Sequence, residues 1–442
     1  MNVPEMLRRL DIERLSPMQA QAAEAIQTHD NVILLAPTGT GKTLAFLLPL
    51  LQLIQPAVGM PQALVLSPTR ELAEQTFSVL QRMKSPFAAC CLHGGRPAMD
   101  EHRQMNASPP QIVVGTPGRV NDHLDKENLD ARTIRLLIID EYDKMLEMKF
   151  QDELERIVQR LSQVQRCILV SATRTHDIPP FMAFRHHRPV ELDYLGHSQE
   201  DIPPAIHHYI VHSPSKDKLD TLRLLLSKLE DQQAVVFLGF RESVERTGHY
   251  LRQQGFSCSL FHGGMQQDDR ERALYIFSSG AAQVLVSTDL SARGLDIPQL
   301  QNVVHYHLPA KREEYVHRCG RTGRWDNAGR SFMLLSPDED SPSFQGIRFE
   351  EYPLLPPYPA PRPPQWATLY IGKGKRDKIS RTDVLGFLCK QGGAKGEEIG
   401  RIDIRERHTY VAVRRTRCQQ ILAQCAGEKI KKMKTIVERM QS

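Results

Sequence analysis

The amino-acid sequence predicts an α/β protein with two tandem doubly wound parallel-sheet domains and a small α+β domain towards its C-terminal end. Short apolar runs of strand length alternate with helical patterns, and this alternation begins again after a break near residues 193–213. A proline-rich stretch then separates a last, basic segment from the rest. Continuous apolar strands joined by helices are typical of parallel sheets that helices cover on both faces.

Five apolar runs provide the strands expected in the first domain, which we place at residues 1–195. They are NVILLAP (31–37), QALVLSP (62–68), QIVVGTP (111–117), RLLIIDE (135–141) and CILVSAT (167–173). Helical patterns separate them, such as RELAEQTFSVLQRM (70–83) and FQDELERIVQRL (150–161). The alternation predicts one doubly wound sheet.

The second domain, placed at residues 196–337, repeats this pattern. Its expected strands are AVVFLGF (234–240), SCSLFHGG (257–264), AQVLVSTD (282–289), NVVHYHLP (302–309) and RSFMLLSP (330–337). Residues 338–365 predict a semi-rigid linker, because YPLLPPYPAPRPPQ (352–365) contains too much proline for helix interiors or central strands. The last domain is expected at 366–442, with strands at 367–373, 398–406 and 409–415 and helices at 382–391 and 417–426.

Charge is distributed unevenly between the last domain and the rest of the chain. Residues 366–442 contain 18 Lys and Arg against 8 Asp and Glu, whereas residues 1–365 contain 39 against 44. A basic segment beside a mildly acidic body indicates a domain that binds a polyanion. The alternative is a basic surface that serves solubility alone.

The composition excludes several classes of protein. Hydrophobic and charged contents of 40% and 25% are those of an ordinary globular protein. No apolar run approaches the roughly 18–20 residues that span a bilayer, and the N-terminal residues carry no export signal. The 8 cysteines form no CxxC pair, so we expect no zinc site and a cytoplasmic protein with reduced thiols.

The stretch APTGTGKT (36–43) lies between the first expected strand and an apolar helix, as in the phosphate-binding loop, with alanine in place of the first glycine. Gly39 and Gly41 allow the backbone N–H groups to face phosphate oxygens. Lys42 is expected to reach the β- and γ-phosphates, and Thr43 to offer its hydroxyl to Mg²⁺. A tight turn without ligand is the alternative.

A second expected strand ends in LLIIDEYDKM (136–145), which carries three carboxylates within four positions. In phosphate-loop NTPases an acidic residue after a strand holds Mg²⁺ beside the loop, and Asp140 fits this pattern. Glu141 is placed to orient and deprotonate the attacking water. Side chains alternate along a strand, so Tyr142 is expected to point away from its acidic neighbours and to have a packing role.

With these motifs, residues 1–335 resemble the DEAD-box family of superfamily 2 RNA helicases, with a motif II that reads DEYD. The other matching motifs, in the order of the family, are SPMQ (16–19), APTGTGKT, PTRELA (68–73), GG (94–95), TPGR (116–119), SAT (171–173), QDDR (267–270), STDLSARGLDI (287–297) and HRCGRTGR (317–324). Their joint order and spacing are highly specific. The resemblance implies two RecA-like domains and RNA-stimulated ATP hydrolysis that unwinds or remodels structured RNA locally.

The resemblance also implies roles for individual residues around ATP. Gln19 would read the adenine edge, and Asp143 would bond to Ser171 or Thr173 and so link the nucleotide to the RNA side. The implied catalytic residues are Lys42, Asp140, Glu141 and the arginine fingers Arg321 and Arg324, and Thr43 and Asp140 would hold Mg²⁺ through water. The implied nucleotide-binding residues are Arg14, Gln19, Thr38, Gly39, Thr40, Gly41, Lys42, Thr43, Gly294 and Asp296.

Family members hold RNA mainly through its phosphates and 2′-hydroxyls, which selects RNA without reading its sequence. The implied RNA-binding residues of residues 1–335 are Arg70, Gly95, Thr116, Gly118, Arg119, Thr288 and Arg318. The chain departs from the family at Ile12, where an aromatic residue usually stacks on adenine. Nucleotide affinity is therefore expected to be lower unless Arg14, nearby, compensates.

Residues 366–442 are similar to the C-terminal domain of the DbpA-like branch, a small RRM-type fold that grips structured ribosomal RNA. Here Tyr370 and Tyr410 are the aromatic residues available for stacking on bases. The implied RNA-binding residues of this domain are Tyr370, Lys373, Lys375, Arg407 and Tyr410. Alternatively, the two tyrosines belong to the core of the sheet and only the cations contact RNA.

The sequence therefore predicts a monomeric, ATP- and Mg²⁺-dependent RNA helicase that remodels structured RNA, with ribosomal RNA during large-subunit assembly as the expected substrate. Two other classes remain as alternatives. An ATP-gated RNA clamp without useful turnover is disfavoured by Glu141, because such a clamp does not need to position water. A DNA helicase is disfavoured by the full DEAD-type set of motifs.

Overall fold

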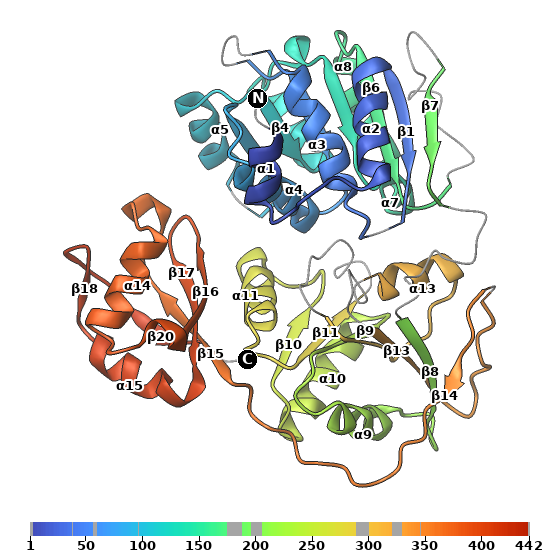
Figure 1. Ribbon diagram of the computed structural model, residues 1–442, viewed down its shortest axis with the longest axis vertical. Coiled ribbons are helices and arrows are strands. Elements are labelled where there is room, and N and C mark those ends of the chain that lie inside the picture. The colour runs from blue at the N-terminus through green and yellow to red at the C-terminus, as the bar shows by residue number, and fades with distance from the viewer. Residues whose placement is uncertain are drawn as a thin grey trace. The chain divides into compact units, whose positions relative to one another are not determined.

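Two parallel sheets of seven strands and a smaller antiparallel sheet confirm the predicted fold class (Figure 1). The structure is a computed structural model, and it describes residues 3–37, 39–55, 60–95, 97–174, 188–195, 206–288, 300–320, 329–344 and 346–440. The described chain forms two compact units, one up to residue 195 and the other from residue 206 onwards. No helix within these ranges is sufficiently long and apolar to pass through a bilayer.

The sheet of the first domain has the strand order β3-β4-β2-β5-β6-β1-β7, and all its described pairs are parallel. Its strands are β1 (Asn31–Leu35), β2 (Ala63–Leu66), β3 (Ala89–Leu92), β4 (Ile112–Gly115), β5 (Leu136–Ile139), β6 (Arg166–Ser171) and β7 (Val190–Asp193). The central strands are buried along their whole length, as their continuous apolar runs predicted.

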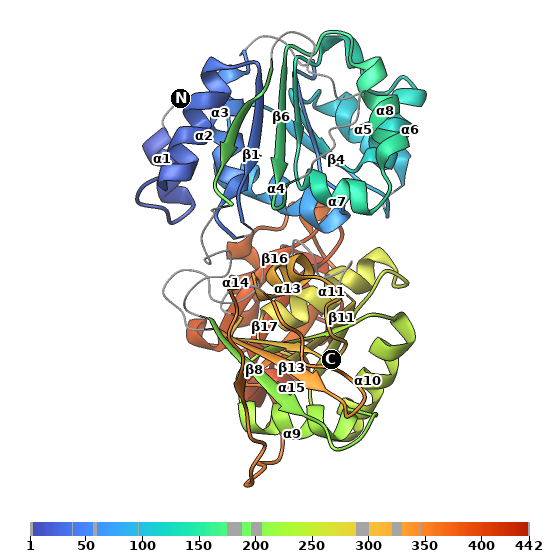
Figure 2. The same ribbon diagram turned by 90° about the vertical axis from the view of Figure 1, so that its right-hand side faces the viewer.

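Helices cover both faces of this sheet (Figure 2). One apolar core joins the sheet to α1 (Val3–Arg9), α2 (Pro17–Thr28), α3 (Lys42–Leu53) and α4 (Arg70–Arg82). A second core on the opposite face includes residues of α5 (Ala98–Ala107), α6 (Pro117–Asp125), α7 (Tyr142–Glu147) and α8 (Gln151–Arg160). A short 3₁₀ turn, Ala131–Thr133, precedes β5.

The second domain repeats the topology, with the strand order β10-β11-β9-β12-β13-β8-β14. Its strands are β8 (Ile206–His212), β9 (Ala234–Leu238), β10 (Cys258–Phe261), β11 (Val284–Thr288), β12 (Asn302–His305), β13 (Gly329–Leu335) and β14 (Glu350–Glu351). Its described helices are α9 (Leu219–Leu229), α10 (Arg241–Gln253), α11 (Gln267–Ser278) and α13 (Arg312–Cys319).

The proline-rich segment packs along the second domain over part of its length. β14 pairs with β8, and the Tyr352 N–H donates to Ile210 O at 2.8 Å. The Tyr352 ring meets the rings of Tyr209 and Phe332 edge-on, with centroids 5.3 and 5.2 Å away. Aromatic contacts of this kind fix the start of the segment on the domain.

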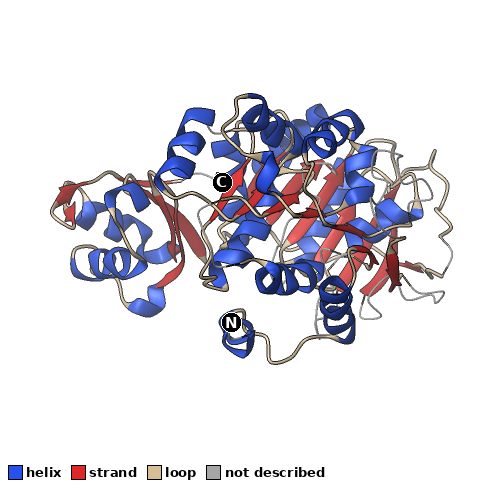
Figure 3. Ribbon diagram, turned by 90° about the horizontal axis from the view of Figure 1, so that it is seen from above, coloured by secondary structure: helices blue, strands red, loops and turns tan. Residues whose placement is uncertain are grey.

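The small domain is an antiparallel sheet of order β16-β17-β15-β20 with helices on one side (Figure 3). Its strands are β15 (Trp366–Ile371), β16 (Ile399–Ile404), β17 (Thr409–Arg414), β18 (Lys429–Ile430), β19 (Met433–Lys434) and β20 (Val437–Arg439). Its helices are α14 (Arg381–Lys390) and α15 (Arg415–Cys425), with 3₁₀ turns at Lys375–Asp377 and Gly396–Glu398. The core lies between these helices and one sheet face.

The sequence prediction missed several short or outer strands. Strand β8 falls inside residues 193–213, which the broken periodicity assigned to the join between domains. Strands β3 and β7 have only four residues each, and β18–β20 lie in a basic stretch with few apolar residues. Such strands carry too little hydrophobic pattern to be recognised without their neighbours.

Candidate functional site

The predicted site residues of the first domain gather at the carboxyl ends of its strands. β1, β5 and β6 are neighbours in the sheet, and they lead to the loop at 36–41, to Asp140 and to Ser171. β2, β3 and β4 are also neighbours, and they lead to Arg70, Gly95 and Thr116. Ligands of open α/β sheets bind at this edge. The motifs expected to bind nucleotide and those expected to bind RNA thus occupy two halves of one sheet edge.

The phosphate-binding loop has the backbone that its glycines predicted. Gly39 and Gly41 have φ angles of 87° and 82°, in the left-handed region that other residues avoid. A Cβ on Gly41 would lie 2.3 Å from Gln19 Nε2. That amide donates to Gly41 O at 3.2 Å, while Gln19 Oε1 accepts from Ser16 N at 2.9 Å. Gln19 therefore joins the start of α2 to the loop; Thr38 lies outside the described residues.

Lys42 opens α3 with its side chain almost fully buried, at 7% exposure. Its ammonium donates to Ala36 O at 2.7 Å and to Pro37 O at 3.3 Å. Burial lowers the pKa of Lys42, while the charge of Glu141 and the other nearby carboxylates works to raise it. Thr40 Oγ1 also donates to Pro37 O, at 2.9 Å, and Thr43 lies half-buried in the first turn.

Asp140 and Glu141 form a buried acidic tip at the end of β5. The Glu141 N–H donates to Asp140 Oδ1 at 3.0 Å, and the Lys144 ammonium lies 3.0 Å from Glu141 Oε2. Burial first, and the charge of Glu141 second, raise the pKa of Asp140 to about 7. A carboxyl held in this way gains from a cation placed beside it.

These residues fit a Mg²⁺–nucleotide complex. Magnesium is usually bound through one or two carboxylates together with substrate phosphates. The buried Asp140, with its raised pKa, and the glycine loop supply these two parts at adjacent strand ends. Across the described ranges, no group of three or more His, Cys, Asp and Glu residues is arranged to hold a metal ion by itself.

Asp143 is bonded to the SAT segment at the end of β6. The Thr173 hydroxyl donates to Asp143 Oδ2 at 2.9 Å. Ser171 Oγ donates to Thr173 O at 2.6 Å and accepts from the Thr173 N–H at 3.2 Å. Of the two partners considered for Asp143, Thr173 therefore makes the contact and Ser171 holds its backbone.

Tyr142 packs away from the acidic tip, which confirms its predicted packing role. Its side chain is 1% exposed within the second apolar core, and burial raises its pKa. The reason differs from the one expected, because Tyr142 begins α7 and does not continue a strand. Glu141 makes the turn with a φ angle of 50°, so the chain changes direction between the Glu141 carboxylate and the tyrosine.

On the half of the edge that holds the expected RNA motifs, Arg70 lies at the start of α4 close to the GG loop. A Cβ on Gly94 would lie 2.8 Å from its guanidinium, and Gly95 has a φ angle of 105°. Thr116 occupies the N-cap position of α6 without a side-chain capping hydrogen bond, and Gly118 borders open space. A side chain at position 94 would therefore displace Arg70.

Arg119 is held by a buried carboxylate that the sequence analysis missed. Arg119 Nη1 lies 3.0 Å from Glu101 Oε2, and Glu101 is 4% exposed. Glu101 also contacts His123 Nε2 at 2.9 Å and accepts from the His93 N–H at 3.2 Å. Three elements thus position one arginine. An acidic residue in the first turn of a helix is too common to have signalled this role.

In the second domain, Thr288 ends β11, and Gly294, Asp296, Arg321 and Arg324 lie outside the described residues. Arg318, predicted to contact RNA, is 4% exposed. Its guanidinium donates to His307 O at 2.8 Å and pairs with Glu314 at 2.7 Å. This placement favours support of α13 over contact with an RNA phosphate.

In the small domain, the predicted RNA residues divide between two places. Lys375 and Arg407 are exposed, and Lys373 pairs with Asp377 at 3.0 Å. Tyr410 is 3% exposed, and its ring centroid lies 5.2 Å from that of Tyr275 in α11. The expected base-stacking residue is therefore covered by the second domain.

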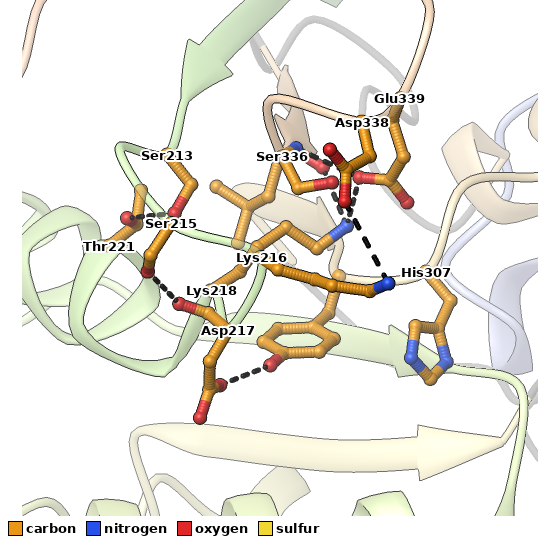
Figure 4. Close-up of polar contacts among 12 residues, drawn as sticks. Ser213, Ser215, Lys216, Asp217, Lys218, Thr221, His307, Ser336, Asp338 and Glu339 are labelled. Atoms are coloured by element: carbon orange, nitrogen blue, oxygen red, sulfur yellow. Dashed lines mark hydrogen bonds and ion pairs between the residues drawn. The ribbon is translucent and has the colours of Figure 1, made fainter.

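A polar cluster outside the family motifs ties the loop after β8 to the end of β13 (Figure 4). The buried Lys218 ammonium donates to Leu334 O at 2.9 Å and to Glu339 at 2.7 Å. Burial lowers the pKa of Lys218, and the hydrogen bond to Glu339 works against this. Glu339 also accepts from the Ser336 N–H at 2.8 Å, so the cluster closes on itself.

Comparisons with known proteins identify three families along the chain. Residues 16–179 match the DEAD/DEAH box helicase family, residues 217–326 the helicase conserved C-terminal domain, and residues 368–439 the DbpA RNA binding domain. Over 436 residues the chain is 35% identical to the ATP-dependent RNA helicase DbpA of Escherichia coli strain K12, which covers 96% of this chain and 94% of that protein.

Solved structures of helicases bound to RNA share the fold. S. cerevisiae Dbp5 bound to RNA and ADP BeF3 is 27% identical, with a TM-score of 0.69 over 80% of this chain and 94% of that one. The DEAD-box helicase Mss116 bound to ssRNA and UDP-BeF is 25% identical, with a TM-score of 0.70 over 79% and 77% of the two chains.

Proposed function

Because the chain belongs to the DbpA-like DEAD-box helicases and is an RNA-dependent ATPase, we propose that it remodels structured ribosomal RNA during assembly of the large ribosomal subunit. The observation that carries this proposal is the joining of a DEAD/DEAH box helicase domain to a basic domain of the DbpA type in one chain. The proposed setting is the cytoplasm, and the proposed active form is a monomer. The proposed domain limits are 1–195 and 196–337 for the two helicase domains, 338–365 for the linker and 366–442 for the small domain.

In the proposed ATPase reaction, residues of the first domain act on the nucleotide in distinct ways. Bound magnesium would neutralise phosphate charge, held by Asp140 and Thr43 through water. Lys42 would exchange its two carbonyl partners for phosphate oxygens, and Glu141 would accept a proton from the attacking water. The bond between Thr173 and Asp143 would report this state to the RNA half of the edge.

The remaining roles in this proposal rest on the motifs alone. Arg321 and Arg324 are proposed as arginine fingers, and Gly294 and Asp296 as part of the ATP site. Arg70, Gly95, Thr116, Gly118, Arg119 and Thr288 are proposed to hold one RNA strand through its phosphates and sugars.

The small domain supplies a cationic end that suits the phosphates of folded RNA. Its loop at 372–379 lies against the turn at 405–408, because the Lys375 N–H donates to Arg405 O at 2.8 Å and the Arg376 N–H to Glu406 O at 2.9 Å. Both segments carry exposed cations, and Lys431 Nζ donates to Lys378 O at 2.7 Å. Clustered phosphate contacts give affinity and orientation without reading sequence.

A charge-reversal experiment tests whether this end selects ribosomal RNA. Lys375→Glu combined with Arg407→Glu should reduce the preference for large-subunit ribosomal RNA over an unrelated transcript by about tenfold or more, because only an RNA whose fold places phosphates opposite both cations can use both contacts. The control reverses two exposed lysines on other elements of the same domain, Lys390→Glu with Lys395→Glu. The measurement is RNA-stimulated ATPase activity with each RNA in turn.

Equal loss in both double variants would mean that net charge alone matters and would contradict targeting by the cationic end. Crosslinking in cells, followed by sequencing of bound RNA, gives an independent check. A peak in one ribosomal RNA segment supports the proposal, whereas a diffuse spread over cellular RNA would make the protein a general RNA chaperone.

A further inference from the structure

The face of the small sheet that lacks helices carries three aromatic side chains. Tyr370, His408 and Tyr410 lie together, with ring centroids 5.2 Å apart for Tyr370 and His408 and 4.6 Å apart for His408 and Tyr410. The opposite face packs on α14 and α15. RRM-type domains stack RNA bases on an aromatic sheet face, so the contacts of this face decide how the domain can bind RNA.

Helix α11 of the second helicase domain contacts the aromatic face. The rings of Tyr275 and Tyr410 are tilted by 32° with centroids 5.2 Å apart, and the Tyr275 hydroxyl donates to Arg401 O. Tyr275 is 2% exposed and Tyr410 is 3% exposed. Burial raises the pKa of both phenols, that of Tyr410 to about 12.

Polar contacts surround this pair of rings. Arg401 donates to Ser278 Oγ at 3.0 Å, and Arg405 pairs with Glu271 at 3.3 Å. Just beyond α11, a Cβ on Gly280 would lie 3.2 Å from the Trp366 side chain at the start of β15. The contacts thus extend from the first turns of α11 to the residues that follow its end.

From these contacts we infer that the aromatic face is an intramolecular docking surface for α11, in which Tyr275 takes the place of a stacked base. RNA binds the small domain at its cationic end, and it reaches that end while the domain stays docked on the second helicase domain. The RNA part of this inference rests on the proposed function; the docking part does not.

Docking fixes the orientation in which the small domain presents bound RNA to the second helicase domain. An RNA element held at the cationic end keeps one orientation relative to the second helicase domain, because α11 belongs to that domain and carries Tyr275. A freely tethered domain would present the same element in many orientations. Undocking would expose two large aromatic side chains to water, which disfavours it.

The docking is tested by a charge-exchange cycle in the full chain without RNA. Glu271→Arg and Arg405→Glu each place like charges at the contact, whereas the double variant restores opposite charges. Fluorophores placed through unnatural amino acids at the exposed positions 253 and 390 report the separation of the two domains. We expect one narrow distance distribution in wild type and in the double variant, and a broad one in each single variant.

A broad distribution in wild type, or one that none of the variants changes, would overturn the docking. The matched control is Leu385→Ala, which shortens an exposed apolar side chain on α14 of the same domain and should leave the distribution narrow. Because the cycle exchanges long charged side chains and removes no apolar core residue, folding of either domain is not put at risk by a cavity.

The position of the RNA is tested with two tyrosine variants of the full chain and fragmented large-subunit ribosomal RNA as the probe. Tyr370→Ala and Tyr275→Ala should each leave RNA affinity within twofold of wild type, since no base stacks on the face. A tenfold loss with Tyr370→Ala, or a tenfold gain with Tyr275→Ala, would show that bases use the face and would overturn the inference. If wild type itself does not prefer this RNA, the proposed function fails while the distance measurement still decides the docking.

Discussion

The two helicase domains have the same strand order but use the loop after their first strand in opposite ways. In the first domain β1 leads to Lys42 at the start of α3, and in the second β8 leads to Lys218 just before α9. These strands hold the same position, sixth in sheets of identical order. Both lysines are buried, and burial lowers the pKa of each.

The difference lies in what surrounds each ammonium. Lys42 donates to carbonyls of its own glycine loop, whose N–H groups can turn towards a phosphate. Lys218 is paired with Glu339 and bonded to Leu334 O, and its loop, SPSKDK (213–218), contains no glycine. Carboxylates also lie near Lys42, but Glu339 is bonded directly to the Lys218 ammonium and so occupies it. The lysine after this sheet position is therefore placed to meet a phosphate in the first domain, whereas in the second it holds two segments of the domain together.

The largest expected effect comes from removing the proposed catalytic base of the first helicase domain. Glu141→Gln should lower ATP turnover about 10²–10⁴-fold, because the amide cannot take a proton from water. ATP-dependent RNA binding should be preserved or tightened, since the side chain keeps its size. Steady-state ATPase assays and RNA binding with ATP present measure the two effects. Unchanged turnover would contradict the role of Glu141.

The next largest effect comes from removing the buried lysine that holds two segments of the second helicase domain together. Lys218→Met should lower the free energy of unfolding by about 1–3 kcal/mol, because it removes the hydrogen bonds of the buried ammonium to Leu334 O and to Glu339. The control is Lys216→Met in the same loop, whose exposed side chain lies 3.7 Å from Asp338; exposed pairs contribute about 0–1 kcal/mol. Chemical denaturation measures both. Similar losses in the two variants would mean that the buried pair holds nothing together.

How far the sequence could predict the polar sites of each helicase domain depended on whether their residues lie in one contiguous motif. The phosphate loop, DEYD and SAT are contiguous motifs, so their chemistry could be assigned before any contact was known. Lys218, Glu101 and Tyr275 act through residues distant in sequence, and no local pattern marks them. Tyr410 was expected to stack on RNA bases, and its contact with α11 was missed for the same reason. The exposure of a side chain depends on what packs against its face of the sheet, and the sequence of one strand does not reveal this.

One buried titratable group in each helicase domain should change the stability in opposite directions as the pH falls. Asp140 has a folded pKa of about 7, above its ordinary value of 3.8, so the folded state takes up its proton first and is stabilised as the pH falls through 7. His305, fully buried, has a pKa well below 6.5, so the unfolded state takes up its proton first and stability is lost as the pH falls below 6.5.

Variants isolate these contributions when stability is measured at pH 7.5 and pH 5 without magnesium. Asp140→Asn should stabilise the chain more at pH 7.5 than at pH 5. His305→Gln should destabilise it less at pH 5, with a change of about 2 kcal/mol from the titration of one buried histidine. The prediction fails if either difference from wild type is independent of pH.

The smallest expected effect concerns Ile12, on the nucleotide side. Its half-buried side chain packs against the core of α1 and α2, and its N–H donates to Leu7 O at 3.0 Å, so the backbone there is fixed. Ile12→Phe would add an aromatic face at the position where the family usually stacks on adenine. Aromatic pairs contribute about 0.5–1.5 kcal/mol beyond their area, so the apparent KM for ATP should fall about two- to tenfold.

The matched control for this change is Ile12→Leu, which keeps the apolar volume without adding a π face and should leave the KM for ATP unchanged. Comparison with GTP separates stacking from recognition of the adenine edge, because stacking should improve the binding of both nucleotides whereas the Gln19 amide should still distinguish them. An unchanged KM in Ile12→Phe would mean that another group, such as the exposed Arg14, already covers the base. Weakened binding in both variants would instead show that Ile12 serves the core, so that the first domain too uses part of its nucleotide edge for cohesion.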